Sequence, residues 1–473
     1  MPRVPRRIHS IVRSPTRPSI LTDLLPFKER PSTSIHRSVL VSPNPPQAPS
    51  PPESGSAHTL SVNSEVAPLE EVLVHRPGRE LDRVSPEHMH ELLFDDLLFS
   101  DRAREEHDTL RRVVGAVTGR PEGVHDVLDL FEQCLQRSEP REAFVDALCR
   151  EAAHRNYGPV RRELAELEPP KLLRFVLTGE NPLDLEALPA PNLMFTRDLG
   201  AVVGSCLILS HAARPARIRE TLMLRTVARY HPLFAGDRDR VVTLPPTVTF
   251  EGGDLLVASD DTVLVGVSER TGLGGAQAVV RALFDHTETE HVLLVDVPKR
   301  RASMHLDTIF TFLTESQCMI YPEVVAGDRH NVVGYRRPEN WNSGRIDAET
   351  EPSPTLPARF YPNLHAALEE VLERDLDFIP CGGPDPLDQK REQWTDAANL
   401  LAPRPGVVIG YERNRRTFET LAERGYRLAT AHEVMGEAPL SSEEALAIKL
   451  EGNELSRGRG GARCLTLPIR RAS

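Results

Sequence analysis

The best candidate nucleophile in this 473-residue chain is Cys464, which follows a short run rich in glycine and arginine near the C-terminal end. The run reads RGRGGAR at 457–463, and the apolar segment 465–469 comes directly after the cysteine. Glycines let a backbone lie close to a ligand, and nearby guanidinium groups favour a thiolate over a thiol. A lone cysteine is more often an inert buried side chain, so the rest of the chain has to decide between the two interpretations.

Four further motifs place polar side chains just ahead of apolar runs. They are NLMFTRD at 192–198, FEGGD at 250–254, HLD at 305–307 and REQWTDAAN at 391–399. Each has a structural alternative, since Asp198 could cap a turn, a glycine pair is typical of a hairpin bulge, and the last segment could be purely structural. His305 and Asp307 are the sharper pair, because residues i and i+2 of a strand share a face and would point into one cavity.

Histidine and aspartate are also metal ligands, so a metal site is the rival interpretation of the motif at 305–307. No further His-rich cluster in the sequence completes a coordination sphere. The expectation is therefore a catalytic pair that works without a metal.

These motifs open a repeated pattern. At four places, an aspartate is followed by two apolar runs with a turn between them. This pattern predicts β-hairpins over 199–209, 255–267, 308–321 and 397–411. A helix is predicted after each hairpin, at 217–230, 275–284, 364–373 and 415–424, and a short strand after each helix, at 241–244, 292–297, 378–380 and 426–430.

With an opening unit near Ser61, the pattern gives five modules. Modules that each bury a sheet face against a neighbour close naturally into a ring, and residues at their strand starts then converge on its axis. The alternative, a doubly wound α/β sheet, has single parallel strands alternating with helices and does not explain hairpins.

The chain ahead of the repeats has two parts. Residues 1–60 are rich in proline, serine and arginine, which cannot bury enough apolar area to offset chain entropy, so a disordered tail is expected. Apolar residues at helical spacing then predict helices at 87–99, 101–117, 127–136, 141–155 and 160–167. The predicted organisation is a tail over 1–60 and a catalytic α/β domain over 61–473, interrupted by a helical insertion over 85–178.

The overall composition limits the classes of partner. A net charge of −12 argues against nucleic acid or an anionic membrane as partner and is compatible with a cationic substrate. Six cysteines without a CxxC spacing favour a reducing compartment. No apolar run reaches the length of a membrane span and the N-terminus lacks a signal-peptide pattern, so the expected location is the cytoplasm. Self-association into a homo-oligomer is left open.

Taken together, the motifs resemble the arginine deiminases of the guanidine-modifying, or pentein, superfamily. The resemblance runs over 61–469 and includes the module motifs, the turn SERT at 268–271, the helical insertion and the terminal GRGGxxC. It implies a five-bladed α/β propeller and hydrolysis of L-arginine to L-citrulline and ammonia in arginine catabolism. The sequence departs from the family at Ala397 and Leu400, where glycine and threonine are usual, and at Cys381, which precedes two glycines where three are common.

The resemblance also implies a role for each polar side chain. Cys464 would attack the guanidinium carbon to form a covalent thiouronium adduct, while Asp198 and Asp307 would hold the guanidinium nitrogens. His305 would protonate the leaving ammonia and then activate water, with Glu251 orienting its imidazole. The candidates for binding the rest of the substrate are Asn192, Phe195, Arg217, Arg270 and Arg459, the arginines as partners of its carboxylate. No metal and no organic cofactor is implied.

Three alternatives stay open. Another pentein reaction, such as amidino transfer or hydrolysis of a methylated arginine, would use the same cysteine, histidine and acidic groups. A metal-dependent ureohydrolase would release urea and lose activity with a chelator. A pentein-fold binding protein that has lost catalysis would be expected to lack the nucleophile, whereas Cys464 and His305 are both present.

Overall fold

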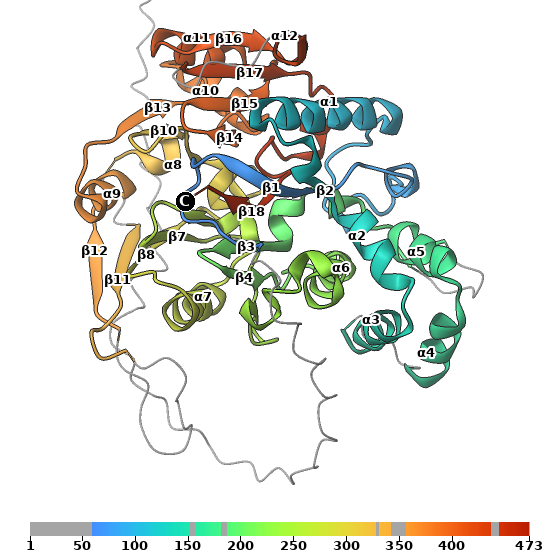
Figure 1. Cartoon of the computed structure of the whole chain (residues 1–473). Coiled ribbons are helices and arrows are strands. Elements are labelled where there is room, and N and C mark those ends of the chain that lie inside the picture. Colours follow the sequence, from blue (N-terminus) through green and yellow to red (C-terminus); the bar gives the residue numbers. More distant parts are fainter. Residues whose placement is uncertain are drawn as a thin grey trace, which may run out of the picture.

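The computed structural model describes residues 59–151, 157–180, 187–327, 331–341, 356–436 and 444–472. The described chain is a mixed α/β structure in which helices surround several small sheets (Figure 1). All but the last two residues of the tail predicted over 1–60 lie outside the described residues. Within them, no helix combines the length and the apolar character needed to cross a membrane.

The described strands form five separate sheets. Their strand orders are β18-β1-β2, β3-β4-β5, β12-β11-β8-β7-β6, β13-β10-β9 and β14-β15-β17-β16. The strands are β1 (Leu69–Val74), β2 (Val124–Asp126), β3 (Gly200–Val203), β4 (Cys206–Leu209), β5 (Val241–Thr243), β6 (Leu255–Val257), β7 (Thr262–Val267), β8 (His291–Asp296), β9 (Phe310–Phe312), β10 (Gln317–Ile320), β11 (Val332–Arg336), β12 (Ala358–Tyr361), β13 (Asp377–Pro380), β14 (Leu401–Arg404), β15 (Val407–Tyr411), β16 (Arg427–Thr430), β17 (Leu446–Leu450) and β18 (Leu467–Arg471).

Each sheet contains the same core of three strands, an antiparallel pair with a third strand parallel to one member of the pair. The four predicted hairpins are confirmed as β3-β4, β6-β7, β9-β10 and β14-β15. The last sheet departs from the prediction, because β17 lies between β15 and β16, so the strand predicted at 426–430 does not pair with the hairpin directly.

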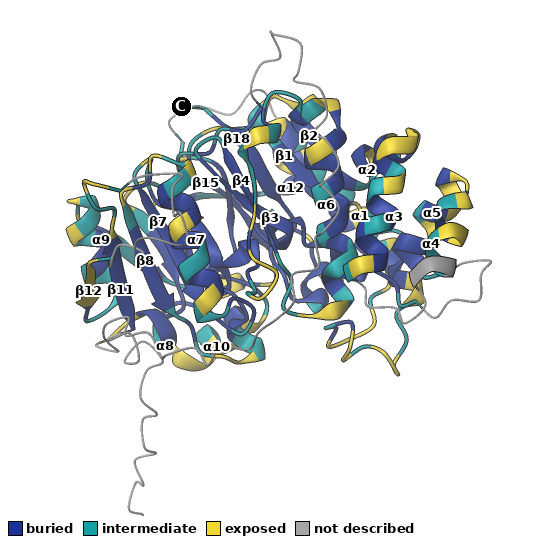
Figure 2. Ribbon diagram, turned by 90° about the horizontal axis from the view of Figure 1, so that it is seen from below, coloured by how far each residue is buried: buried dark blue, intermediate teal, exposed yellow. Residues whose placement is uncertain are grey.

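The helices predicted after the hairpins are confirmed, with ends shifted by a few residues. They are α6 (Ile218–Tyr230), α7 (Leu273–His286), α9 (Leu364–Leu372) and α11 (Arg415–Glu423). Three further helices that the sequence did not predict are α8 (Pro322–Val325), α10 (Pro386–Trp394) and α12 (Ala431–Gly436). Figure 2 shows most strands as buried, apart from the edge strand β12, and the helices as exposed on their outer faces. This is the pattern expected when each helix turns one apolar stripe toward a sheet.

The predicted helical insertion divides into two parts that pack on different elements. Its helices are α1 (Ser100–Thr118), α2 (Val127–Leu135), α3 (Ser138–Glu151), α4 (Tyr157–Glu166) and α5 (Pro169–Thr178). Helix α1 lies against β14 and α12 of the last module, whereas α2 and α3 pack on α6 (Figure 1). Strand β2 lies between α1 and α2 in the chain and joins the first sheet, so this region also contributes to the sheets.

The helix predicted at 87–99 is wrong, since most of this segment forms turns and none of it is helical. Leu93 has a φ of +66°, in the left-handed region that an α-helix does not use. The carbonyl of Leu92 accepts a bond from Asn192 Nδ2 at 2.8 Å, and that of Leu93 accepts one from Arg301. These bonds to distant side chains replace the helical ones, which apolar spacing alone could not reveal.

Candidate active site

Three of the predicted motifs meet through short 3-10 helices that precede the first strand of a sheet. These are η5 (Thr196–Leu199), η9 (Gly252–Asp254) and η11 (Leu306–Thr308), and η9 contacts both of the others. The strand predicted for His305 and Asp307 is therefore wrong, because the chain already turns at Leu306. The two side chains nevertheless reach one site, since neighbouring modules bring their strand starts together.

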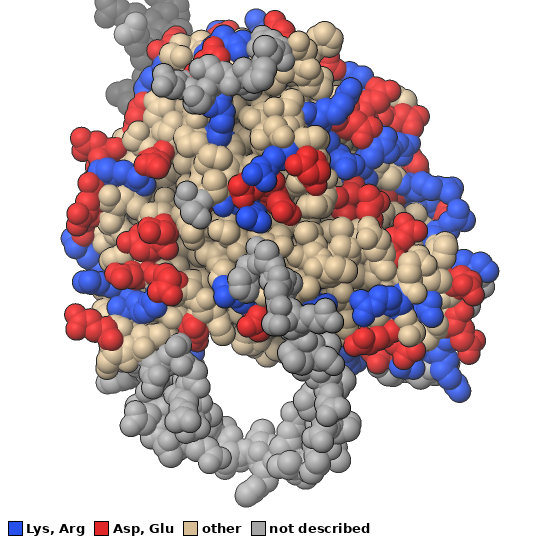
Figure 3. All heavy atoms as spheres, in the orientation of Figure 1, with Lys and Arg blue, Asp and Glu red and all other residues tan. Residues whose placement is uncertain are grey.

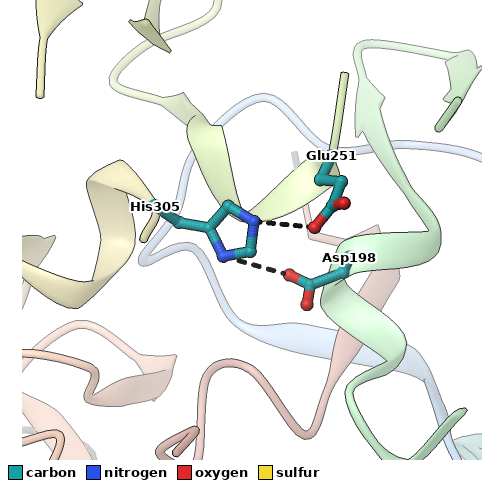
Figure 4. A group of neighbouring side chains, drawn as sticks. All are labelled: Asp198, Glu251 and His305. Atoms are coloured by element: carbon teal, nitrogen blue, oxygen red, sulfur yellow. Dashed lines mark hydrogen bonds and ion pairs between the residues drawn. The ribbon is translucent and has the colours of Figure 1, made fainter. Parts of the chain in front are cut away.

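His305 lies between two carboxylates (Figure 4). Its Nε2 is 3.0 Å from Glu251 Oε2, and its Nδ1 is 3.6 Å from Asp198 Oδ1. Burial by itself lowers the pKa of His305, but Asp198, the hydrogen bond with Glu251, and Asp254 together raise it to about 9. The imidazole therefore carries a proton at neutral pH and can act as an acid.

Cys464 is buried beside Asp307, with 3.6 Å between its Sγ and Asp307 Oδ2. The amide of Asn399 fixes both residues, because Oδ1 accepts from the Cys464 backbone N–H at 2.9 Å and Nδ2 donates to the Asp307 carbonyl at 3.0 Å. The segment 391–399, which the sequence left as possibly structural, thus supplies a direct support of the nucleophile.

The pKa of Cys464 lies well above its ordinary value, opposite to the expectation from the nearby arginines. Burial is the main cause, and Asp307, Asp198 and Asp396 add to it, whereas the Arg463 guanidinium acts against it. The side chain is therefore a thiol in the free protein, and a bound cation among the carboxylates would favour the thiolate.

Asp198 and Asp307 each have one oxygen anchored by an arginine and one that accepts no hydrogen bond from the described residues, although Asp198 Oδ1 faces His305 Nδ1 at 3.6 Å. Oδ2 of Asp198 accepts from Arg217 at 2.6 Å, and Oδ2 of Asp307 accepts from Arg463 at 2.7 Å. Among the described residues, neither Oδ1 atom has a hydrogen-bond partner, although both are buried. A buried acceptor without a donor is costly, so this pair of oxygens indicates a site shaped for the N–H groups of a ligand.

A small cavity connects these groups to the predicted binding residues. Its lining includes Asn192, Phe195, Asp198, Arg217, Arg270, His305, Arg459 and Cys464, together with Leu93, Arg301, Met304 and Gly458. Glu251 and Asp307 are not in this lining and lie buried just behind it. The enclosed volume is about 20 Å³, close to that of one water molecule, so a larger ligand requires side chains to move apart.

The three arginines proposed for a ligand carboxylate differ in their present partners. Arg217 is engaged with Asp198 and, through Nε, with Glu220 Oε2 at 2.8 Å. Within the described part of the chain, Nε of Arg270 and all three guanidinium nitrogens of Arg459 lack a hydrogen-bond partner. The Arg459 guanidinium lies 3.6 Å from the centre of the Trp394 ring. Arg270 and Arg459 therefore have donors available for a ligand, and Arg217 would first have to leave Asp198.

The glycine pair at 252–253, for which the sequence suggested a hairpin bulge, is explained by the lack of space for a side chain. A Cβ on Gly253 would lie 2.8 Å from Asp198 Oδ1 and 2.9 Å from the His305 ring, so any larger residue would displace both. Asp254, for which the sequence suggested no role, accepts from the Leu306 backbone N–H at 2.9 Å and holds η11 in place. The only feature of the sequence that pointed to Asp254 is that it precedes a predicted hairpin, as the other three aspartates do.

Asp198, Glu251 and His305 are also arranged closely enough to hold a metal ion. The guanidinium of Arg217 already places a cation there, with NH1 2.6 Å from Asp198 Oδ2 and 3.4 Å from Glu251 Oε2.

The residues at which the sequence departs from the family, Ala397, Leu400 and Cys381, are buried, and none is among the described residues that line the cavity.

Comparison with solved structures finds pentein enzymes at low identity. The N-terminal domain of ArgZ, a cyanobacterial arginine dihydrolase bound to product, is 17% identical, with a TM-score of 0.47 and coverage of 85% of this chain and 97% of that one. A dimethylarginine dimethylaminohydrolase from Pseudomonas aeruginosa is 16% identical, with a TM-score of 0.44 and coverage of 84% and 98%.

Comparison with sequences is more decisive. Arginine deiminase from Listeria monocytogenes serovar 1/2a is 32% identical over 437 residues, which cover 87% of this chain and 97% of the relative. The sequence model of the family described as arginine deiminase matches residues 150–471. This range contains all the cavity residues that the sequence analysis had proposed for the site. The chain therefore belongs to the arginine deiminase family.

Proposed function

We propose that this enzyme hydrolyses L-arginine to L-citrulline and ammonia in arginine catabolism. The observation that carries the proposal is the pair of buried Oδ1 atoms of Asp198 and Asp307, which accept no hydrogen bond within the described chain and lie beside a cysteine and a protonated histidine. A guanidinium is planar and donates N–H groups in several directions, so two carboxylates can hold it at once. The name and length of the Listeria relative support the same substrate.

In the first step, the bound guanidinium aligns its carbon with Cys464 Sγ. Its positive charge offsets that of the carboxylates, lowers the thiol pKa and lets the proton leave for solvent. The thiolate attacks and a C–S bond forms, after which the His305 imidazolium gives its proton to the departing nitrogen. The C–N bond breaks, ammonia leaves, and the carbon remains attached to sulfur as a thiouronium adduct.

In the second step, the now neutral His305 takes a proton from a water molecule. The hydroxide attacks the same carbon, a C–O bond forms and the C–S bond breaks. The proton of the new C–OH group passes to the departing sulfur, so that citrulline leaves, the Cys464 thiol is restored and His305 is again protonated. Glu251 accepts a hydrogen bond from His305 Nε2 at 3.0 Å and so keeps the ring in place through both proton transfers.

The amino-acid end of the substrate is assigned to the other side of the cavity. Arg270 and Arg459 pair with its carboxylate, because Nε of Arg270 and the three guanidinium nitrogens of Arg459 donate no hydrogen bond to any described residue. Nε of Arg270 has only a longer contact with Glu269, at 3.8 Å. Arg217 joins them after exchanging Asp198 for the substrate. Asn192 and Phe195 form the wall, and Asn192 is fixed by its bond to the Leu92 carbonyl.

We also propose that the five sheets close into a five-bladed propeller, interrupted by the helical insertion over 85–178. The shared three-stranded core of all five sheets supports this, as does β18, which pairs with β1 and so joins the last strand of the chain to the first. A catalytic unit over 61–473 preceded by a tail over 1–60 follows as the domain organisation.

The cytoplasm is the proposed location, and L-arginine is the proposed partner. All six cysteines are buried and unpaired, as expected in a reducing compartment. Acidic and basic side chains are interspersed on the face shown in Figure 3, which does not favour a nucleic acid there.

The test is to incubate the purified protein with L-arginine, with and without EDTA, and to measure citrulline, ammonia, ornithine and urea. We expect one citrulline and one ammonia for each arginine consumed, unchanged by the chelator. Ornithine with urea, or loss of activity in EDTA, would contradict the proposal. Methylated arginines in the same assay would separate this activity from other pentein reactions.

A further inference from the structure

Arg463, the residue before the nucleophile, is among the largest fully buried side chains of the described protein. Its Nε and NH2 donate to Glu65 at 3.2 and 3.0 Å, and NH2 also donates to the Leu255 carbonyl at 3.1 Å. Its NH1 donates to Asp307 Oδ2 at 2.7 Å. The guanidinium is thus fixed on one edge and presents its remaining nitrogen to Asp307.

Glu65 connects this arginine to the first segment of the described chain. It lies shortly before β1, and its Oε1 also accepts from the Val257 backbone N–H at 3.2 Å. Burial by itself raises the pKa of Glu65, but the Arg463 guanidinium, with smaller contributions from Arg197 and Arg471, lowers it to about 2. An ionised Glu65 therefore balances the charge of Arg463 at all physiological pH values.

We infer that the Glu65–Arg463 ion pair is a positioning device that anchors Asp307 Oδ2, so that Oδ1 is held ready for the substrate guanidinium next to Cys464. The inference deepens the proposed function and rests on it. Arg463 is not in the cavity lining, so it acts through Asp307 and through its charge, whereas the partner of Asp198, Arg217, itself lines the cavity.

The same charge bears on the nucleophile. The groups facing the Cys464 thiol include three carboxylates, those of Asp307, Asp198 and Asp396, and the Arg463 guanidinium acts against them. Other cations also face this group, since Arg217 and the His305 imidazolium pair with Asp198, and Arg459 lies near Asp396 and Cys464. Removal of Arg463 takes away the cation bonded to Asp307 and should make the thiolate harder to form. A group that served only the stability of the fold would not change the acidity of the thiol.

The experiment compares Arg463→Met, Arg463→Lys and Glu65→Gln with wild type. For Arg463→Met we expect kcat/KM to fall roughly 10- to 100-fold, which is the loss expected for one charge-assisted hydrogen bond. Both a higher KM and a lower kcat should contribute to this fall. Lysine should recover part of the loss, since it restores the charge without the fork geometry. Glu65→Gln should shift KM in the same direction by a smaller factor.

The matched control is Arg471→Lys. Arg471 is an equally buried arginine whose NH1 donates to the carbonyls of Ala67 and Ala402, away from Asp307. Lysine keeps the charge that Arg471 also presents to Glu65, so only the fork geometry changes. This variant should keep the wild-type KM. If it raises KM as much as Arg463→Lys does, the effect belongs to the packing of the sheets and the inference is overturned.

A second measurement needs no substrate. The rate of Cys464 alkylation by iodoacetamide, followed on its peptide by mass spectrometry, should have its pH midpoint raised by about one unit in Arg463→Met. An unchanged KM and an unchanged midpoint in a folded variant would overturn the inference. If circular dichroism shows that the methionine variant is unfolded, the same two measurements on Arg463→Lys and Glu65→Gln decide. Failure of the wild type to make citrulline would refute the proposed function separately.

Discussion

Asp198 and Asp307 show how one residue type acquires a special role from its surroundings. An aspartate on a surface satisfies both oxygens with water, whereas each of these has one oxygen fixed by an arginine and the other buried without a hydrogen bond from the described residues. Oδ1 of Asp198 has only a longer contact with His305 Nδ1, at 3.6 Å. The arrangement stores unmet hydrogen-bonding capacity at two points beside one sulfur. A ligand with N–H donors in one plane can form hydrogen bonds to both Oδ1 atoms that the free protein cannot form. This explains selectivity for a guanidinium.

Replacement of either carboxylate by its amide tests this directly. Asp198→Asn and Asp307→Asn keep the side-chain size but remove a charge-assisted bond, so we expect kcat/KM for arginine to fall at least ~100-fold in folded protein. Asp108→Asn, which changes a surface partner of Arg76, is the control and should behave as wild type. Near-normal kinetics in either active-site variant would mean that the pocket is misplaced.

The two chemical roles are separated by a second pair of variants. Cys464→Ser should be almost inactive, because a hydroxyl is far less acidic than a thiol and the site has no base matched to it. His305→Ala should lose both the acid of the first step and the base of the second, so that citrulline formation falls at least ~100-fold. Any adduct that still forms should be hydrolysed slowly, and mass spectrometry should locate it on the peptide containing Cys464. Citrulline formation by Cys464→Ser, or an adduct on another cysteine, would refute the assignment.

The raised pKa of His305 predicts the alkaline limit of the reaction. The proton donor is the imidazolium, which in the free enzyme is present below a pKa of about 9 and lost as pH rises through it, so kcat/KM should fall above about pH 9. Glu251→Gln removes one of the groups that raise this pKa, and the falling limb should move to lower pH. If the alkaline fall in activity occurs at the same pH in Glu251→Gln as in wild type, a group other than His305 is responsible for it.

At the scale of elements, the site depends on short connections rather than on the strands themselves. The helices η5, η9 and η11 carry Asp198, Asp254 and Asp307, and the contacts of η9 with the other two fix their spacing. The strands that follow are buried and paired, so each turn stands on a rigid support. Asn399 and Asp254 then tie neighbouring turns together through bonds to the backbone.

A comparable tie joins the first sheet to the helical region. The buried His75 at the end of β1 lies 3.3 Å from Asp126 and 3.2 Å from Glu80, and although burial opposes it, these carboxylates raise its pKa to about 10. Asp126 also accepts from the Leu128 backbone N–H at the start of α2. One imidazolium therefore connects strand, turn and helix.

His75→Gln should lower the free energy of unfolding by about 3 kcal/mol near pH 6, because a buried charge pair loses one member. The folded pKa is raised, so the stabilisation is complete below the unfolded pKa of about 6.5 and is lost as pH rises through about 10. Urea titrations at several pH values should show the difference from wild type shrinking over this range. His125→Gln, which alters a more exposed pair with Glu71, should show a much smaller difference.

At the scale of the whole molecule, the two ends of the described chain hold the architecture together. Thr59 N donates to Asp237 Oδ2 at 2.7 Å, and Ser61 N donates to the Ile469 carbonyl at 3.0 Å. The segment before β1 also provides Glu65, which reaches Arg463 beside the nucleophile. A short N-terminal stretch thus supports a site whose nucleophile lies near the opposite end of the sequence.

Truncation separates this stretch from the residues ahead of it. Deletion of residues 1–55 should leave the melting temperature and arginine hydrolysis nearly unchanged, because their composition predicts few buried contacts. Deletion of residues 1–66 also removes Glu65, and kcat/KM should then fall at least ~10-fold. A large loss in the shorter deletion would contradict the prediction for the tail.

Much of this protein was determined by local sequence. Alternating apolar runs, each opened by an aspartate, predicted the hairpins β3-β4, β6-β7, β9-β10 and β14-β15, and apolar spacing predicted the helices that follow them, because buried strands and amphipathic helices must show those periods. The motifs also indicated most of the cavity lining, since polar residues at strand starts have no structural need to be so concentrated.

Tertiary structure decided what depends on residues far apart in the chain. The segment 87–99 is not helical because Asn192 and Arg301 take its carbonyls, and η11 replaces a predicted strand because its turn packs on η9. The pKa of Cys464 is raised rather than lowered because folding buries it among carboxylates, which outweigh the adjacent Arg463. Such bonds and charges join modules separated by many residues, and no local pattern in the sequence records which of them will meet.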